Sequence, residues 1–325
     1  MSDHSTAHDH HDYDDHHGHE HGHTLGAGGH VHAPASFGRA FAIGIGVNLA
    51  YVVAEAFYGV MAHSVALLAD AGHNFSDVLG LAGAWAASML AAREPSERFT
   101  YGLGRSSVLA ALGNAVVLLL VTGGIGWEAL RRLAEPHPAS GVTIIVVAAI
   151  GIVVNGGTAL LFMRGRKDDL NIRGAFLHMA ADALVAAGVV VTGILIIGTG
   201  WLWLDPVIGL AVSAAIVAST WSLLREALQL SLDAVPVGID RTEVQHYLHG
   251  LPGITEVHDL HIWGLSTTES ALTAHLVGLE QIDGAVLLPQ VSAELKRRFG
   301  IGHTTLQIET LETARLCGLR PDHVI

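Results

Sequence analysis

Cysteine and lysine are both scarce in this sequence of 325 residues. The single cysteine, Cys317, excludes an internal disulfide framework and a metal site built from several cysteines of one chain. The only lysines are Lys167 and Lys296, and neither lies in a G-x-x-x-x-G-K-[ST] phosphate loop, so no ATP-binding motif supplies energy. The first 35 residues contain no apolar core of the kind a secretory signal needs.

Charged residues are scarce as well. Asp, Glu, Lys and Arg make up 14% of the chain, whereas soluble domains carry about 25%. Half of the residues are hydrophobic, and the mean hydropathy is +0.45. This composition excludes a simple soluble enzyme and predicts a polytopic membrane protein in the lipid bilayer. The net charge of −13 argues against nucleic acid as a partner.

Histidine, in contrast, is abundant, and half of the 22 histidines lie in residues 1–35. These histidines are interleaved with Asp and Gly, so the segment cannot bury enough apolar surface to fold alone. We expect a disordered cytoplasmic tail. A His-rich composition predicts weak metal capture, and a solvated spacer is the alternative. The tail histidines are His4, His8, His10, His11, His16, His17, His19, His21, His23, His30 and His32.

Residues 36–230 contain six apolar stretches, each close to the ~20 residues that span a bilayer. Their many Gly and Ala residues favour close helix packing. The expected spans are Ala40–Ala62, Ser64–Ala92, Ser106–Leu130, Gly141–Met163, Gly174–Gly198 and Trp203–Leu224. With the N-terminus in the cytoplasm, nine Lys and Arg residues face the cytoplasm and two face outward, so we expect both termini to be cytoplasmic. The sequence thus predicts an all-α six-helix transmembrane bundle.

A second domain is expected over residues 236–312, followed by a polar tail at 313–325. Helices are predicted at Arg241–His249 and Ala285–Phe299, the latter closed by Gly300. Strand patterns cover Thr255–Leu265, Ala271–Leu279 and His303–Thr310. The order αββαβ predicts a cytoplasmic α+β domain of ferredoxin-like type, with its helices on one face of the sheet.

Two of the spans carry the same His-x-x-x-Asp pattern, in His73 with Asp77 and in His178 with Asp182. Residues four apart share a helix face, so each pair can present an imidazole and a carboxylate to one point. Ionisable groups inside a span are costly and usually functional. Two nitrogens and two oxygens suit tetrahedral Zn²⁺, with Co²⁺, Ni²⁺ and Cd²⁺ as competitors. We therefore predict one shared metal site.

Other polar residues also fall within the spans. Glu55 and Asp70 are expected to line a hydrated path to the metal site. Asn114 and Asn155 are expected to form hydrogen bonds between helices. Asp205, which with Pro206 opens the sixth span, is expected to cap a helix. In the second domain, His258 and His261 are three apart on one strand, so only one of them can join His275 on a given face.

A series of ordered motifs resembles the cation diffusion facilitator family, most closely its zinc-transporting branch, from about residue 39 to 311. The resemblance implies a homodimer of six-span subunits in a bacterial inner membrane, with a cytoplasmic metallochaperone-like domain and efflux of divalent metal in exchange for protons. It maps the transport site onto His73, Asp77, His178 and Asp182. The motifs are NLAYVVAE (48–55), HSVALLADAGHNFSDVLGL (63–81), TYGLGRSSVLAALGNA (100–115), AFLHMAADALVAAGVVV (175–191), LDPVIGLAVSAAIV (204–217), VHDLHIWGL (257–265) and ALTAHLV (271–277).

The resemblance also implies a metal site in the cytoplasmic domain at His258, His275 and Glu309, to which His30 or His32 adds a ligand. Hydrogen-bonded sheet histidines are the alternative. Cys317, in the polar tail, is expected to be an exposed thiol, with an extra metal ligand as the alternative. His246 and His249 are expected to be surface residues. The sequence departs from the family at Gly104, where His is common, and at Ser107, where Glu is common, which argues against a further zinc site in that loop.

Site chemistry suggests how transport is driven, because protons compete with metal for imidazole and carboxylate ligands. Zn²⁺ would load from the cytoplasm, the bundle would reorient, and protons would displace the metal outside. The competing hypotheses are efflux of a broader range of Zn²⁺, Cd²⁺ and Co²⁺, a membrane-bound metal sensor, and an intramembrane metalloenzyme. The enzyme hypothesis is the weaker one, since four strong ligands close a site to catalysis and no separate acid–base set is present.

Overall fold

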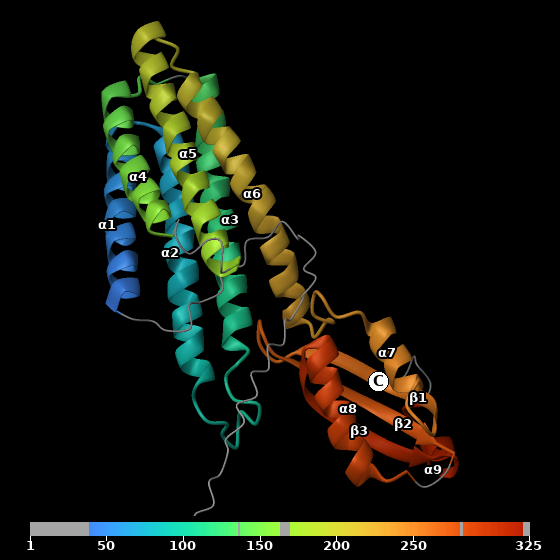
Figure 1. Cartoon of the computed structure of the whole chain (residues 1–325). Helices are drawn as coiled ribbons and strands as arrows, with labels where there is room; N and C mark the ends of the chain where they lie inside the picture. The colour runs from blue at the N-terminus through green and yellow to red at the C-terminus, as the bar shows by residue number, and fades with distance from the viewer. Residues whose placement is uncertain (1–38, 136, 163–169, 280–281, 321–325) are drawn as a thin grey trace, which may run out of the picture.

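Six long helices form a bundle in the computed structural model, which describes residues 39–135, 137–162, 170–279 and 282–320 (Figure 1). All six predicted apolar stretches are helices, and four of the described helices are long and apolar enough to cross a membrane, namely α3, α4, α5 and α6. The helices are α1 (Arg39–Met61), α2 (Val65–Ala91), α3 (Ser106–Ala134), α4 (Gly141–Phe162), α5 (Leu170–Thr199) and α6 (Leu204–Ser231).

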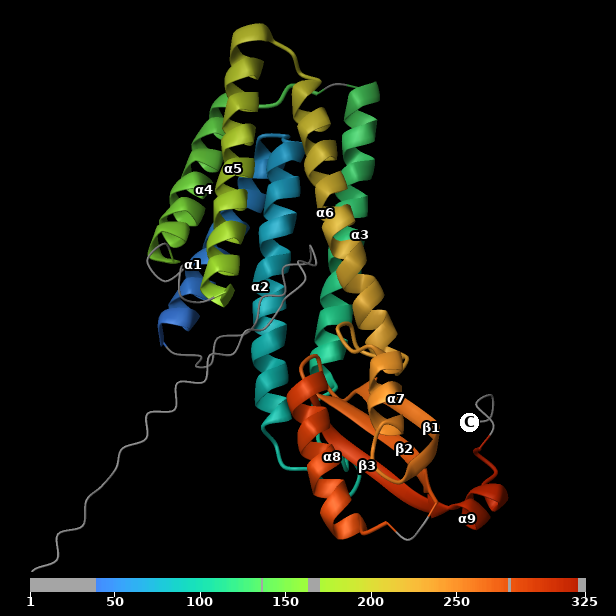
Figure 2. The ribbon, with the colours of Figure 1, turned by 45° about the vertical axis from the view of Figure 1, so that its right-hand side comes forward.

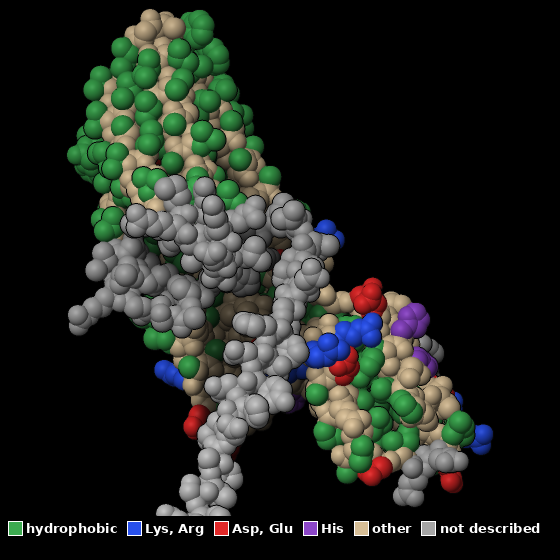
Figure 3. All heavy atoms as spheres, viewed as in Figure 1, with side chains coloured by type: hydrophobic (Ala, Val, Ile, Leu, Met, Phe, Trp, Pro, Cys, Tyr) green, Lys and Arg blue, Asp and Glu red, His purple; other side chains and the backbone are tan. Residues whose placement is uncertain are grey.

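The bundle presents an apolar exterior, and the second domain does not. On the face shown in Figure 3, hydrophobic side chains cover the upper bundle, whereas charged and histidine side chains appear among the hydrophobic ones on the lower domain. Large hydrophobic residues are exposed along the helices, among them Leu120, Val153 and Leu184, each with more than two thirds of its surface accessible. Such a surface is unfavourable in water and favourable against lipid, which agrees with the predicted membrane location.

Close helix contacts depend on glycine where α4 meets α5. A Cβ added to Gly141 would lie 2.9 Å from the Gly193 carbonyl oxygen, and one added to Gly193 would lie 3.0 Å from the Gly141 carbonyl oxygen.

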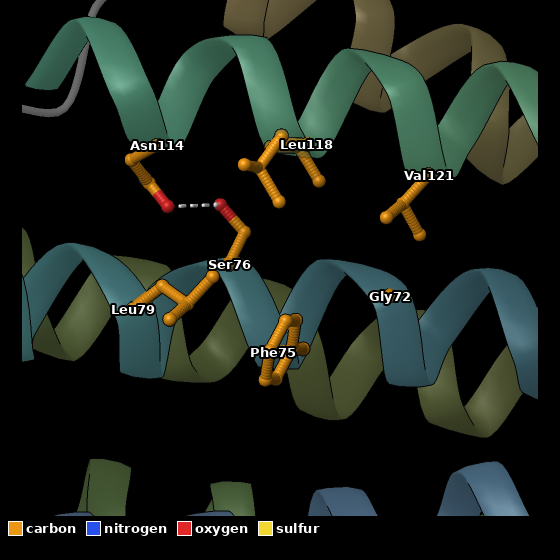
Figure 4. A pocket seen from close by; sticks show the side chains of 8 residues that line it. Gly72, Phe75, Ser76, Leu79, Asn114, Leu118 and Val121 are labelled. Atoms are coloured by element: carbon orange, nitrogen blue, oxygen red, sulfur yellow. Dashed lines mark hydrogen bonds between the residues drawn. The ribbon is translucent and has the colours of Figure 1, made fainter.

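Helices α2 and α3 also lie face to face. Figure 4 shows Ser76 and Asn114 pointing toward one another beside a small pocket lined by Phe75, Leu118 and other residues. Ser76 Oγ donates to Asn114 Oδ1 over 3.4 Å, the interhelical bond expected for Asn114. The buried Asn155 Nδ2 has no hydrogen-bond partner among the described residues, so the expectation is not met there.

The start of α2 is capped by a residue of another helix. Asp205, in the first turn of α6, accepts hydrogen bonds from Ser64 Oγ at 2.5 Å and from the backbone N–H of Val65 at 2.6 Å. Ser64 is the N-cap of α2 and accepts from the Leu67 N–H over 3.1 Å. The expectation that Asp205 caps a helix is confirmed, and the helix is α2, because the chain reversal between α5 and α6 brings its buried carboxylate to the open N–H groups of α2.

The second domain has the predicted element order, with short shifts in the bounds: α7 (Arg241–His249), β1 (Ile254–Gly264), β2 (Ser270–Gly278), α8 (Gly284–Phe299) and β3 (Ile301–Thr310). A further helix, α9 (Leu311–Leu316), was not predicted. The sheet order is β1-β2-β3, with β1 antiparallel and β3 parallel to β2. Gly300 ends α8 in the left-handed conformation, as expected. Buried residues of α7, α8 and the strands share one apolar core.

The domain with the sheet lies beyond the lower ends of α3 and α6, as both views show (Figure 2). Two contacts join it to the start of α3 and the loop before it: the Thr267 N–H donates to Ser107 Oγ over 3.1 Å, and the Tyr101 and His303 rings meet edge to face. Arg105 also pairs with Asp233, in the linker that follows α6. A Cβ added to Gly104 would lie 3.1 Å from the Leu265 carbonyl oxygen. The loop before α3 therefore contacts the turn between β1 and β2.

Candidate metal centres

The two His-x-x-x-Asp pairs meet between α2 and α5. One ligand atom from each of His73, Asp77, His178 and Asp182 lies within 4.8 Å of the other three. Helices α2 and α5 run in opposite directions, as the ribbon shows, so the His of each helix lies level with the Asp of the other. His73 Nε2 is 3.3 Å from Asp182 Oδ1, and His178 Nε2 is 3.2 Å from Asp77 Oδ2.

These contacts between helices are shorter than those within a helix. The His73–Asp77 distance is 3.9 Å and the His178–Asp182 distance is 3.7 Å. Four buried atoms of the group, His73 Nδ1, Asp77 Oδ2, His178 Nε2 and Asp182 Oδ2, have no hydrogen-bond partner among the described residues. Buried polar atoms normally have one. Two imidazoles and two carboxylates with free lone pairs are a donor set that fits a tetrahedral divalent cation.

The four side chains differ in exposure according to how near they lie to the end of the bundle that faces the domain with the sheet. Asp77 and His178, on the side nearer to the domain with the sheet, are 28% and 33% exposed. His73 is 23% exposed and Asp182 only 3%, and these two lie one turn further away. The group is therefore more open toward the second domain than toward the far end of the bundle.

A second polar group lies behind this one, between α1 and α2. Glu55 is fully buried and accepts hydrogen bonds from Tyr51 Oη at 2.8 Å and from Asn74 Nδ2 at 3.1 Å. Asp70 is also fully buried, and neither of its oxygens has a hydrogen-bond partner in the described structure. The sequence suggested that both acids line a hydrated path. In this conformation neither reaches solvent, because α1 and α2 pack directly over them.

A second group of potential ligands lies in the domain with the sheet. His258 on β1 stands directly opposite His275 on β2, and Glu309 comes from the end of β3. Glu309 Oε1 is 3.0 Å from His275 Nδ1, and Glu309 Oε2 is 3.5 Å from His258 Nε2. The His258 and Glu309 side chains are only 2% and 4% exposed, yet both His258 nitrogens and Glu309 Oε2 lack a hydrogen-bond partner among the described residues. A bound cation would satisfy Glu309 Oε2 and one of the two His258 nitrogens.

His261 stays outside this group. The register of β1 and β2 shifts between His258 and His261, where Asp259 has a positive φ of 51°. His261 Nε2 contacts Asp259 Oδ1 at 2.9 Å, and its side chain is 43% exposed. The helix residues His246 and His249 are exposed on α7, as expected. His30 and His32 lie outside the described residues.

Cys317 lies with the cytoplasmic group, which agrees with the alternative of an extra ligand and not with the favoured interpretation of a lone exposed thiol. Its sulfur is 3.7 Å from His275 Nδ1 and within 4.8 Å of ligand atoms of His258 and Glu309. The residue is half-buried, so the expectation of a fully exposed thiol is wrong. Helix α9 returns the chain to the sheet after β3, and the short separation between Glu309 and Cys317 was the signal available in the sequence. Within the described ranges these two groups are the only ones that bring three or more potential ligands together.

Comparison with protein families finds two matches that together cover most of the chain. Residues 41–230 match the model of the cation efflux transmembrane domain. Residues 236–311 match the model of the cation efflux protein cytoplasmic domain.

Curated relatives are similar over nearly their full length. The metal cation efflux system protein CzcD of Cupriavidus metallidurans is 34% identical over 88% of this chain and 90% of its own. The cadmium, cobalt and zinc/H(+)-K(+) antiporter of Bacillus subtilis is 33% identical over 87% of this chain and 92% of its own. The zinc transporter ZitB of Escherichia coli is 33% identical, with coverages of 81% and 85%. Among solved structures, the metal-bound C-terminal domain of the CzcD transporter is 35% identical over 22% of this chain and 99% of its own, with a TM-score of 0.21.

Proposed function

This chain belongs to the cation efflux family, also called the cation diffusion facilitator family, and from that premise we propose that it exports divalent metal, mainly Zn²⁺, from the cytoplasm by proton antiport. Its family and relatives are membrane transporters, so this chain is a multi-pass membrane transporter and not an enzyme. The intramembrane metalloenzyme hypothesis is therefore dropped. The single observation that carries the proposal is the group of two imidazoles and two carboxylates between α2 and α5.

The proposed transport site uses His73, Asp77, His178 and Asp182 as four ligands of the transported ion. A mixed nitrogen and oxygen donor set favours Zn²⁺ over Mg²⁺ or Mn²⁺, which prefer oxygen. The names of the relatives mention zinc, cadmium and cobalt, so efflux of a broader range of metals is the second candidate. Both candidates use the same site and differ only in selectivity.

Proton coupling follows from the ligands themselves. Metal binds neutral imidazole and ionised carboxylate, so a proton on either group competes with the metal. A free imidazole has a pKa of ~6.5, close to the pH range in which the two sides of a membrane differ. The greater exposure of Asp77 and His178 supports a state open toward the cytoplasmic domain, in which Zn²⁺ loads. Movement of α2 and α5 against the other helices would then expose the site outside.

The proposed organisation has a His-rich cytoplasmic tail over residues 1–35, six spans within 36–230, a cytoplasmic domain at 236–312 and a tail at 313–325. Both termini lie in the cytoplasm of a bacterium, and the chain spans the inner membrane. The match to the family's cytoplasmic domain supports a homodimer. In that domain, His258, His275 and Glu309 hold a second metal ion, whose role is regulatory or structural. A pure metal sensor remains the competing function, because it needs the same cytoplasmic site.

Flux measurements in proteoliposomes test this function. We expect Zn²⁺ uptake into vesicles to rise when a pH gradient is imposed with the lumen acidic, and to be reduced by competing Cd²⁺ and Co²⁺ more than by Mn²⁺. His178→Ala should abolish the flux, whereas His246→Ala, which changes an exposed histidine on α7, should not. Flux that ignores the pH gradient would overturn proton coupling. No flux at all, with metal still bound, would support the sensor.

A further inference from the structure

The end of the bundle farther from the domain with the sheet is held together by contacts between separate helices, and we call it the far end (Figures 1 and 2). The Ser140 N–H, just before α4, donates to the carbonyl oxygen of Ala62, just after α1, over 3.0 Å. Arg132 Nη1, in the last turn of α3, donates to the His63 carbonyl oxygen at 2.5 Å. Asp205 joins the first turn of α6 to the start of α2. Five of the helices or their adjoining turns therefore meet in hydrogen bonds at this end.

Buried apolar side chains fill the bundle between the far end and the proposed transport site. They come from α2, α4 and α5, and Leu67, Ile144 and Val189 among them are completely buried. His73 follows Leu67 by six residues, which is about 9 Å along a helix. Asp182, the ligand of the site with the least exposure, is only 3% exposed. In this conformation the site is therefore closed toward the far end.

The hydrogen bonds to Asp205 add to a helix end that is already capped. Ser64 caps α2 by accepting from the Leu67 N–H. The Asp205 carboxylate accepts from Ser64 Oγ, from the Val65 N–H and, over 3.4 Å, from the Ala66 N–H. The positive end of the α2 dipole stabilises a negative charge there. Because Ser64 provides a cap from within its own segment, the additional effect of Asp205 is to tie α6 to α2.

The backbones of α2 and α6 also approach closely at the same point. A Cβ added to Gly209, one turn after Asp205 on α6, would lie 2.9 Å from Val65 Cγ1 and 3.1 Å from the Val65 carbonyl carbon. Val65 itself is completely buried. Asp205 and Gly209 therefore hold the same residue of α2, one through a hydrogen bond and the other through van der Waals contact. An ion that leaves toward the far end requires these packed helices to part.

We propose that Asp205 is a positioning residue of transport, which holds the start of α2 against α6 and keeps the transport site closed toward the outside. The ion leaves only after the hydrogen bonds from Ser64, Val65 and Ala66 to Asp205 have broken. Water that enters between the parted helices then binds the freed N–H groups, so the hydrogen bonds re-form when the site closes. The inference rests on the proposed transport function and identifies the contact that must open for release.

A disulfide between α2 and α6 tests the proposal without changing Asp205. A Cβ added to Gly209 would lie 3.2 Å from the Val65 Cβ. The Cβ atoms of a disulfide are about 3.5–4.5 Å apart, so a small shift allows the bond. We expect Val65→Cys combined with Gly209→Cys to form it in diamide, a thiol oxidant that adds no metal. Zn²⁺ flux into proteoliposomes should then fall at least about 10-fold, because the linked helices cannot part, and dithiothreitol should restore it.

Two controls accompany this measurement. Gly209→Cys alone introduces the same crowding without a partner thiol, and its flux should be equal in diamide and in dithiothreitol. The wild type should also keep its flux in diamide, since its only cysteine, Cys317, lies in the cytoplasmic domain. Unchanged flux through the disulfide-linked protein, with the link shown by mass spectrometry, would overturn the proposal. A wild type without any flux would instead refute the proposed transport function, and the role of Asp205 with it.

Thiol labelling from outside the cell measures the closure of the far end directly. Leu67→Cys places a thiol beneath the contact, and a membrane-impermeant reagent does not reach Cys317 in the cytoplasm. Adding Asp205→Ala should speed the labelling of this thiol at least about 10-fold, because local opening becomes more frequent. Adding Asp240→Ala, which removes the exposed N-cap of α7, should leave the rate unchanged. Equal rates with and without the Asp205 carboxylate would contradict the proposal. The disulfide experiment keeps Asp205 and decides the question even where Asp205→Ala does not fold.

Discussion

The two groups of potential metal ligands differ in how the chain supports them. The intramembrane group uses two helices, each of which contributes a His and an Asp four residues apart, and three of its four side chains are 23–33% exposed. The cytoplasmic group takes one residue from each of three strands and one from the segment after β3, and His258 and Glu309 are almost completely buried. A site that must release its ion benefits from ligands on separate helices that can move apart. A site anchored within one sheet is suited to retain its ion.

The largest effect in this comparison is expected from Asp182→Asn. The change keeps the shape of the side chain and removes the charge of the most buried transport ligand, which is 3.3 Å from His73. We expect vesicle Zn²⁺ flux to fall by roughly 100-fold or more, because even outer contacts of a metal site are worth 10–100-fold. Glu309→Gln, the matched change in the cytoplasmic group, should lower flux by less than about 10-fold. Equal losses would mean that the two groups do not have separate roles.

A smaller effect is expected from the cap of α2. Asp205→Ala removes the acceptor for Ser64 and for the Val65 N–H, at a position that is almost fully buried. We expect a loss of about 1–3 kcal/mol of stability, measured from thermal unfolding followed by tryptophan fluorescence. Asp240→Ala, which removes the exposed N-cap of α7, provides the comparison in the cytoplasmic domain and should cost about 1 kcal/mol. A larger effect at Asp240 would show that α2 does not depend on α6 for its cap.

The smallest effect is expected at a contact after α9, where Arg320 Nε and Nη2 donate to the two carboxylate oxygens of Glu256 on β1, at 2.9 and 2.7 Å. Glu256 has a lowered pKa in the folded state because of these hydrogen bonds, so its pair with Arg320 is complete above the ordinary value of 4.5 and is lost as the pH falls through the lower folded value. Arg320→Gln should return the Glu256 pKa toward 4.5 in an NMR titration. At neutral pH it should also speed thiol labelling of Cys317 a few-fold. Arg315→Gln, on the exposed side of α9, should change neither. Unchanged labelling in Arg320→Gln would mean that this contact does not hold the segment after α9 near the sheet.

Periodic patterns made much of the fold predictable. The six apolar stretches are helices, although α6 continues from its expected end at Leu224 to Ser231. The αββαβ order of the second domain is confirmed. The His-x-x-x-Asp spacing also selected the four side chains that meet between α2 and α5, because residues four apart on a helix must share a face. The assignment of these residues to transport stays a prediction until flux is measured.

Contacts between distant segments were not predictable in the same way. Nothing local at Asp205 indicates that it caps α2, 140 residues earlier in the chain. Glu55 and Asp70 looked like groups on a hydrated path, and only the packing of α1 against α2 shows that both are buried. Cys317 was expected mainly to be an exposed thiol in a polar tail, and only the path of α9 returns it to the sheet.

The sequence by itself therefore determined the membrane character, the order of the elements and the identity of the ligands on each helix, since these depend on composition and on short-range periodicity. The tertiary structure alone decided that each His of the intramembrane group lies nearer to the Asp of the other helix, and that the cytoplasmic group includes a sulfur. Both results depend on the direction and distance at which separate segments pack, and neither direction nor distance is encoded in local spacing.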